Sequence, residues 1–255
     1  MTLKRIIGCM AASAVAWGAV GLGNLAEQPG RAGPGGGGLR AGSVEVTTSL
    51  RYLVHVPSGY AASGDERWPL VLFLHGAGER GDDLERVKAW GPPKMAAAGE
   101  DLPYIMVAPQ CPAGETWNTN TALLLGLLDQ IESEYRVDLS RVYVTGLSMG
   151  GYGTWSLAAA APERFAAIAP VCGGAADPFW RTAGLKDTPI WAFHGSEDTV
   201  VPVSASVIAV EAVRRAGGAA KLTVYEGVGH GSWIPAYEDE EFWEWFLSQT
   251  REVSP

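Results

Sequence analysis

The pattern Gly-x-Ser-x-Gly at residues 146–150 constrains this chain more than any other feature of its sequence. It stands between an apolar segment, which we expect to form a strand over residues 141–146, and an Ala-rich segment typical of a helix over residues 149–161. A turn that joins a strand directly to a helix is sharp, and a side chain at Gly146 or Gly150 would collide with neighbouring backbone. A helix that begins with a serine would account for Ser148 but not for both glycines. The pattern therefore predicts that Ser148 is a nucleophile exposed at the C-terminal edge of a sheet.

A serine nucleophile needs a base that takes its proton and an acid that orients the base. Three of the four histidines lie in or directly after predicted strands, namely His55, His75 and His194. The fourth, His230, lies in a Gly-rich loop after the last predicted strand, so we predict that it is the base. Asp198 follows the preceding strand and is the predicted acid, with Glu197 as the alternative.

The turn His75-Gly-Ala-Gly follows an early predicted strand and suggests an oxyanion hole. A tetrahedral intermediate needs two N–H donors aimed at its developing charge. We predict that the amide of Met149, directly after the nucleophile, supplies one and that the amide of Ala77 supplies the other. The alternative is an ordinary Gly-rich turn with no such role.

Predicted strands and helices alternate along most of the chain. The strands are expected at 70–75, 104–108, 141–146, 166–171, 189–194 and 221–226, after a β-hairpin at 44–56, and the helices near 119–135, 149–161, 203–216 and 238–249. This alternation predicts an α/β fold with a doubly wound, mostly parallel sheet and helices on both faces. One catalytic domain over residues 43–255 fits the length.

The first 42 residues are not expected to belong to this fold. A short basic start at Lys4 and Arg5 precedes an uncharged apolar segment over residues 6–23, which is typical of a secretory signal peptide. We predict a signal peptide over residues 1–26 and a Gly-rich linker over residues 27–42. The protein is then secreted or periplasmic, without stable membrane insertion after processing.

Five motifs together resemble a known group of proteins. They are Phe73-Leu-His-Gly-Ala-Gly-Glu-Arg-Gly, Ala108-Pro-Gln-Cys-Pro, Gly146-Leu-Ser-Met-Gly-Gly-Tyr-Gly, Phe193-His-Gly-Ser-Glu-Asp and His230-Gly-Ser-Trp. Over about residues 45–250 the chain resembles small secreted α/β-hydrolases often labelled predicted peptidases, which are related to feruloyl and acetyl esterases, polyester depolymerases and dienelactone hydrolases. The order Ser148, Asp198, His230 is that of the α/β-hydrolase triad. Dienelactone hydrolases proper carry cysteine where this chain has Ser148, so that narrow activity is not expected.

Cys111 and Cys172 each follow a predicted strand. Export makes a disulfide between them possible. In the usual hydrolase strand order, however, two strands at a spacing of about 4.8 Å separate theirs. That separation puts a disulfide out of reach unless the loops lean together. We therefore favour two free thiols.

Composition narrows the choice of ligands. The net charge of −9 argues against nucleic acid or an anionic membrane as partner. The histidines lack metal-ligand spacing, and no phosphate or dinucleotide loop is present, so neither a metal nor a cofactor is expected. Two of the ten tryptophans, Trp117 and Trp233, lie in or near loops at the active edge. We predict that they line the substrate pocket, although aromatic residues are more often part of the core.

These features predict a serine hydrolase that cleaves a small-molecule or polymeric carboxylic ester through an acyl-enzyme. Two alternatives remain, a serine peptidase of the prolyl oligopeptidase type and a non-catalytic binding domain. No insertion is long enough to build an apolar lid, which favours short or aryl acyl groups over long fatty chains.

Overall fold

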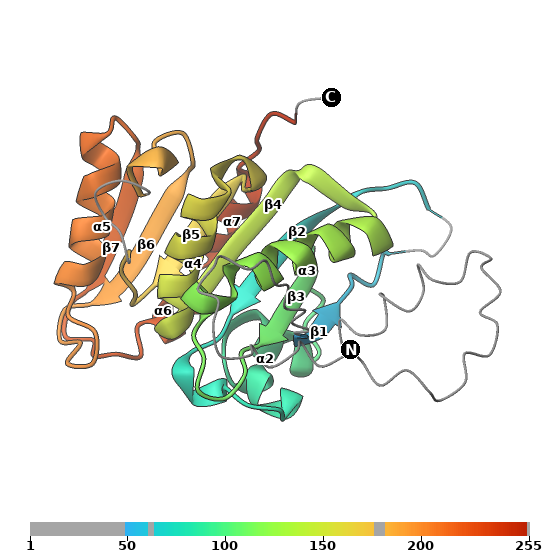
Figure 1. Cartoon of the computed structure of the whole chain (residues 1–255), viewed down its shortest axis with the longest axis horizontal. Coiled ribbons are helices and arrows are strands. Elements are labelled where there is room, and N and C mark those ends of the chain that lie inside the picture. The colour runs from blue at the N-terminus through green and yellow to red at the C-terminus, as the bar shows by residue number, and fades with distance from the viewer. Residues whose placement is uncertain (1–48, 61–63, 176–181, 254–255) are drawn as a thin grey trace, which may run out of the picture. The chain divides into compact units, whose positions relative to one another are not determined.

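Seven strands form a single sheet in the order β1-β3-β2-β4-β5-β6-β7 (Figure 1). The computed structural model describes residues 49–60, 64–175 and 182–253. The strands are β1 (Arg51–His55), β2 (Trp68–Leu74), β3 (Ile105–Gln110), β4 (Val137–Leu147), β5 (Ala167–Val171), β6 (Ile190–Gly195) and β7 (Ala220–Tyr225). β1 is antiparallel to β3, and every other neighbouring pair is parallel. The carboxyl ends of β2 to β7 therefore lie along one edge of the sheet.

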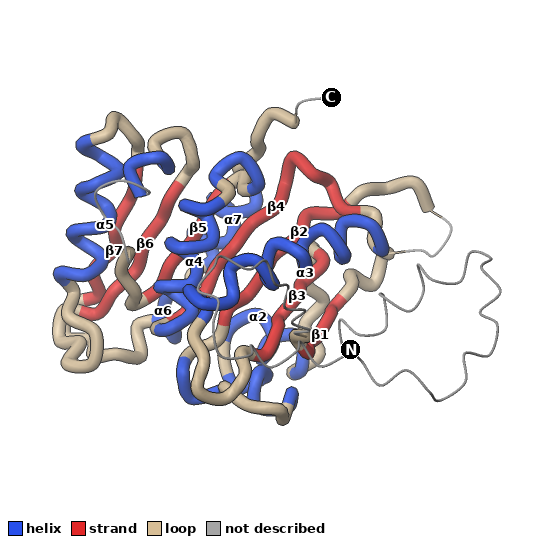
Figure 2. The backbone as a smooth tube through the Cα atoms, in the orientation of Figure 1, coloured by secondary structure: helices blue, strands red, loops and turns tan. Residues whose placement is uncertain are grey.

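Helices cover both faces of this sheet (Figures 1 and 2). One face carries α3 (Thr121–Glu134), α4 (Met149–Ala160) and α5 (Ser204–Arg215), and the other carries α2 (Gly91–Ala97), α6 (Trp233–Glu238) and α7 (Glu240–Ser248). Short 3₁₀ segments connect them at 77–79, 84–89, 117–120, 162–164 and 182–185. The doubly wound α/β fold expected from the alternation of strands and helices is confirmed.

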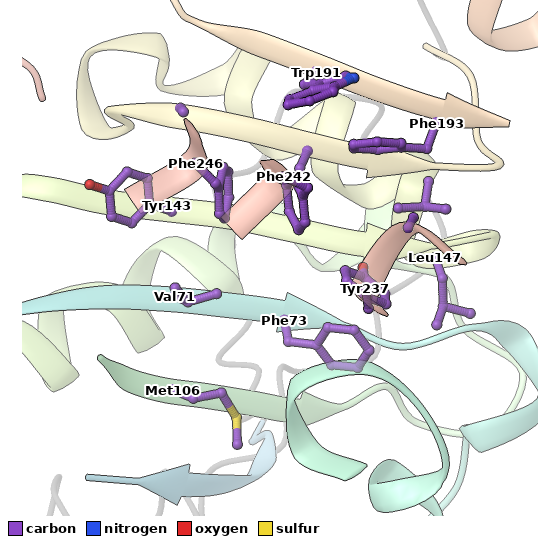
Figure 3. Close-up of a cluster of buried hydrophobic side chains, with 14 of the residues drawn as sticks. Val71, Phe73, Met106, Tyr143, Leu147, Trp191, Phe193, Tyr237, Phe242 and Phe246 are labelled. Atoms are coloured by element: carbon purple, nitrogen blue, oxygen red, sulfur yellow. The ribbon is translucent and has the colours of Figure 1, made fainter. Parts of the chain in front are cut away.

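The core between the sheet and the pair α6–α7 is aromatic (Figure 3). Phe73 of β2 and Phe193 of β6 point from the sheet toward Tyr237 and Phe242 of these helices, and all four side chains are buried. Phe193 and Phe242 pack edge to face, with ring centroids 5.2 Å apart, a favourable geometry for aromatic pairs. This packing fixes α6, and α6 begins just after the loop that carries His230.

Most element bounds agree with the sequence-based expectation to within a few residues, but two helices were not expected. α2 begins Gly91-Pro92-Pro93, a run that suggests a loop. Proline is tolerated in the first turn of a helix, because its missing N–H has no helical partner there. α6 was missed because it has only six residues and contains Pro235.

The start of the chain is described only in part. β1, which is the second half of the expected hairpin, pairs with β3. The predicted signal peptide, the linker and the first half of the hairpin fall outside the described residues. Among the helices of the described ranges, none is long and apolar enough to cross a membrane.

Candidate active site

Ser148 occupies a strained turn between β4 and α4. Its backbone has φ +54° and ψ −115°, a region that residues other than glycine rarely adopt. A Cβ at Gly150 would come within 1.8 Å of the Leu74 carbonyl oxygen, and one at Gly146 within 2.6 Å of the Gly150 carbonyl oxygen. The expectation that both flanking glycines are sterically required is thus confirmed.

Ser148, His230 and Asp198 form one chain of hydrogen bonds. His230 Nε2 lies 2.9 Å from Ser148 Oγ, and His230 Nδ1 lies 2.7 Å from Asp198 Oδ2. Because the carboxylate only accepts, Nδ1 carries the proton and Nε2 is free to accept from the serine hydroxyl. The three residues follow β4, β6 and β7, and the structure brings them together at one edge of the sheet. The alternative acid, Glu197, is exposed.

Asp198 is held in place by more than His230. The amides of Val200 and Val201 each donate to its Oδ1 at 2.9 Å, and its side chain is fully buried. Burial alone would raise the pKa of Asp198, but the hydrogen bonds from His230, Val201 and Val200 outweigh burial and hold the pKa below its ordinary value. Asp198 is therefore an ionised, immobile acceptor at neutral pH.

The loop after β2 runs beside the nucleophile. A Cβ at Gly76 would lie 2.8 Å from Leu147 Cδ1, so the loop passes close to the residue that precedes Ser148. Within the described ranges, no protein acceptor is bonded to the amide of Ala77 or of Met149. Both predicted oxyanion donors are therefore available for a ligand.

Side chains hold the carbonyl groups of this loop. Arg80 Nε donates to the Ala77 carbonyl at 3.0 Å, and Arg86 Nη2 donates to the Gly78 carbonyl. Gln110 Nε2 donates to the Glu79 carbonyl at 2.9 Å. These bonds hold the loop just after Ala77. The Ala77 amide itself shares a rigid peptide plane with the Gly76 carbonyl, which His75 Nδ1 holds, and a fixed donor is what a preorganised oxyanion hole requires.

His75 anchors the start of the same loop. Its Nε2 accepts from the Cys111 amide at 3.0 Å, and its Nδ1 donates to the Gly76 carbonyl at 2.6 Å. Burial is the main cause that lowers the pKa of His75 to about 4, and the nearby Arg80 and Arg86 lower it further. The ring is therefore neutral at physiological pH.

Trp117 lies under this loop and not on the surface. Its side chain is fully buried, and its indole Nε1 donates to the His75 carbonyl at 2.9 Å. Its ring packs edge to face on the His75 ring, with centroids 4.9 Å apart. Because the Trp117 side chain is fully buried, the prediction that it lines the substrate pocket is wrong, and its contacts with His75 make it a support of the loop after β2.

Trp233 lies beside His230. Its ring stands edge to face on the His230 ring at 5.3 Å and is only partly buried. Beyond it lies Trp90, with ring centroids 5.6 Å apart. These two rings line one end of a cavity of about 400 Å³ between α2 and the pair α6–α7.

A second cavity lies against the N-terminus of α4. It measures about 270 Å³ and is lined by Thr116, Asn118, Met149 and Tyr152. Since α4 covers the opposite face of the sheet from α2 and α6, the two cavities approach Ser148 from different sides.

One group of side chains in the described ranges has metal-ligand spacing. Cys172, Asp198 and His230 offer ligand atoms within 4.8 Å of one another. Two of the three already bind each other, and burial raises the pKa of the Cys172 thiol to about 12. A protonated thiol is a poor metal ligand, so this set fits the triad better than a metal. Cys111 and Cys172 are both free and buried, and strands β2 and β4 separate theirs, as expected.

Several supporting residues had no recognisable signal in the sequence. Arg80 lies in a charged run that is typical of a solvated surface, and Trp90 precedes a run of glycine and proline. Arg86 is likewise one of several surface charges. Their roles depend on contacts between distant elements, so only the fold reveals them.

Comparisons with known proteins agree with this geometry. The family model described as "Dienelactone hydrolase family" matches residues 114–241, half of the chain, a stretch that contains Ser148, Asp198 and His230. A solved structure described as "Crystal Structure of a Thermostable Esterase" is 37% identical with a TM-score of 0.70, over 80% of this chain and 60% of that one.

Two curated relatives are similar over the central part of the chain. The bifunctional acetylxylan esterase/xylanase XynS20E of Neocallimastix patriciarum is 30% identical over 58% of this chain and 21% of its own length. The protein named "Probable feruloyl esterase C" of Aspergillus terreus is 27% identical over 64% of this chain and 60% of its own length. The match thus spans between about a fifth and three fifths of these relatives.

Proposed function

Because the chain belongs to the dienelactone hydrolase family, we propose that it is a serine hydrolase that cleaves carboxylic esters through an acyl-enzyme. The single observation that carries the proposal is the continuous hydrogen-bond chain from Ser148 Oγ through His230 to Asp198. The strained backbone at Ser148 supports it, because such strain persists at functional sites.

In the first half of the reaction, Ser148 Oγ attacks the ester carbonyl carbon while His230 Nε2 takes the hydroxyl proton. The amides of Ala77 and Met149 stabilise the oxyanion. Asp198 stabilises the imidazolium that forms and keeps its ring in place. When the intermediate collapses, the C–O bond to the alcohol breaks and His230 Nε2 returns the proton to the departing oxygen.

In the second half, a water molecule attacks the acyl-enzyme. His230 takes a proton from that water, a second oxyanion forms in the same hole, and collapse releases the acid and restores the Ser148 hydroxyl. The relatives named acetylxylan esterase and feruloyl esterase suggest acetyl or feruloyl esters of plant polysaccharide as substrates. The basic and apolar start of the chain suggests that the enzyme acts after export.

Covalent labelling tests this proposal. The intact protein, treated with a fluorophosphonate, is expected to gain one adduct on Ser148, found by peptide mass mapping. Ser148→Ala is expected to lose both the adduct and esterase turnover, with kcat reduced by about 10⁴-fold or more. The matched control is Ser248→Ala, an exposed serine on α7, which should label and turn over like the wild type. A Ser148→Ala protein that keeps more than a few per cent of kcat would refute the assignment.

A panel of substrates separates the remaining alternatives. p-Nitrophenyl esters of graded chain length, a feruloyl ester and a peptide anilide are assayed together. Faster cleavage of the anilide would favour a peptidase, and absence of both labelling and turnover would favour a non-catalytic binding domain.

A further inference from the structure

The cavity between α2 and the pair α6–α7 has no role in the chemistry described so far. We propose that it binds the alcohol part of the ester, and that this alcohol is a neutral sugar. The inference rests on the proposed ester hydrolysis and adds the substrate group that occupies this cavity, which we call the Trp90–Trp233 groove.

The position of the groove relative to the base identifies which part of the ester it takes. The departing oxygen must come within hydrogen-bond reach of His230 Nε2 to receive its proton. Trp233, which forms the near end of the groove, packs directly on the His230 ring. A group attached to the departing oxygen therefore lies next to Trp233, at the near end of the groove.

The second cavity accounts for the acyl part. It begins at Met149, whose amide is a proposed donor to the oxyanion, and continues along Tyr152. The oxyanion is bonded to the acyl carbon, so a cavity at this donor is placed to hold the acyl group. The acyl part and the alcohol part of the ester, which the broken bond joins, thus bind in different cavities.

The lining of the groove fits a sugar. Trp90, Trp233 and Trp243 are partly exposed there and offer apolar ring surface. Flat aromatic surface packs well against the C–H face of a pyranose ring. Exposed carboxylates stand at the rim, where they can accept hydrogen bonds from sugar hydroxyls, namely Glu100, Glu238 and Glu240.

The charge of the groove favours a neutral sugar over an anionic one. Three carboxylates face a single cation, Lys94, which lies 5.6 Å from the centroid of the Trp90 ring. A leaving group that carries its own carboxylate, such as a uronic acid or the end of a hydroxy acid oligomer, would be repelled. A polyester also lacks the hydroxyl groups that the rim would bind.

Matched esters of one acyl group test the proposal. Methyl ferulate, a feruloyl ester of xylose and a feruloyl-hydroxyalkanoate ester are compared in the wild type, Trp90→Ala and Trp90→Phe. For Trp90→Ala, the loss of kcat/KM on the xylose ester should exceed the loss on methyl ferulate by about tenfold. Trp90→Phe keeps an aromatic face, so its kcat/KM on the xylose ester should lie between the values for the wild type and Trp90→Ala. Equal losses on both feruloyl esters would overturn the leaving-group assignment.

A second variant tests the groove independently in case Trp90→Ala does not fold. Ala98→Trp adds a large side chain at an exposed position of the groove and removes no buried contact. It should show the same selective loss on the xylose ester. Ile208→Ala, an exposed site on α5 away from both cavities, is the control and should change neither rate.

The rate of deacylation shows whether the groove binds the alcohol part or the acyl part of the ester. The feruloyl-enzyme, formed rapidly from a p-nitrophenyl ester, is the same whichever alcohol has left. Its hydrolysis should be unaffected by Ala98→Trp, and a slower hydrolysis would assign the groove to the acyl group. A preference for the hydroxyalkanoate ester, lost in Trp90→Ala, would overturn the sugar assignment. Absence of turnover on every ester would instead refute the proposed function itself.

Discussion

His194 Nε2 lies 3.3 Å from Asp198 Oδ2, the same oxygen that accepts the hydrogen bond from His230. The His194 side chain is fully buried, its Nε2 also lies 2.9 Å from the Val201 carbonyl, and its Nδ1 lies 2.7 Å from Ser206 Oγ. The Asp198 carboxylate therefore lies between two histidines, of which only His230 contacts Ser148. This relationship makes His194 a positioning residue for Asp198.

Replacing His194 should impair turnover more than binding. His194→Phe keeps a ring of similar size but has no donor, so Asp198 loses a neighbour that limits its rotation. We expect kcat to fall by about tenfold or more with little change in KM, because the loss is felt in the transition state. His194→Gln, which retains an N–H donor, should recover part of kcat. Equal kcat in both variants would mean that His194 only fills space.

The backbone at the nucleophile should tolerate no added methyl group. Gly150→Ala would place Cβ 1.8 Å from the Leu74 carbonyl oxygen, so β2 or α4 must move. We expect the free energy of unfolding to fall by about 3 kcal/mol or more, measured by urea denaturation. Gly126→Ala is the matched control, because an added Cβ at this exposed position of α3 meets nothing within 4 Å. It should stabilise the protein by about 0.5–1 kcal/mol.

Trp117 should influence catalysis without touching the substrate. Trp117→Phe removes the donor to the His75 carbonyl and leaves that buried oxygen without this bond. We expect a loss of stability of about 1–3 kcal/mol and a lower kcat for esters of every acyl group. A change in acyl-group preference would instead show that Trp117 lines the pocket after all.

The buried His75 should make stability depend on pH. Its folded-state pKa of about 4 lies below the value of about 6.5 in an unfolded chain, so the unfolded state binds more protons between these values. Stability therefore rises with pH through this window, and acidification from pH 6.5 to 4 should cost about 3 kcal/mol from this residue. In His75→Gln the difference in unfolding free energy between pH 7 and pH 4.5 should shrink. An unchanged pH dependence would contradict a neutral, buried His75.

The acyl preference should favour short or aryl groups over long fatty chains. The cavity at Met149 and Tyr152 measures about 270 Å³, below the range of about 300–1,000 Å³ that is common for pockets of drug-sized ligands. We expect kcat/KM to be higher for acetyl, butyryl and feruloyl esters than for octanoyl and palmitoyl esters. If the palmitoyl ester is the best substrate, the acyl group binds elsewhere.

The sequence was a good guide where a residue's place follows from local pattern. Ser148, Asp198 and His230 each follow a strand whose apolar run is visible in the sequence, and parallel strands bring their carboxyl ends to one edge. The same argument does not predict contacts that a side chain makes with residues outside its own helix or strand. Arg86 is one charged residue among several in its segment, and only the fold places its guanidinium on the Gly78 carbonyl.

Trp117 illustrates the opposite case. Its loop position suggested an exposed ring, yet the carbonyl of His75 needs a donor at that depth, and the indole N–H supplies it. Burial of an aromatic ring that also satisfies a polar group is favourable, and it leaves no sign in the local sequence. Whether the side chain of a loop residue is buried depends on neighbours that are distant in the sequence.

The order of the strands also determines when the three proposed catalytic residues are present together during synthesis of the chain. Among the described residues, β7 is the last strand and pairs with β6 alone, and His230 follows it. A nascent chain that has emerged past Asp198 but not as far as β7 contains the proposed nucleophile and acid but not the proposed base. Such an intermediate lacks the proposed base for Ser148, so synthesis must pass His230 before hydrolysis by the proposed mechanism can begin. The proposed activity is thus tied to the synthesis of β7 and of the loop that carries His230.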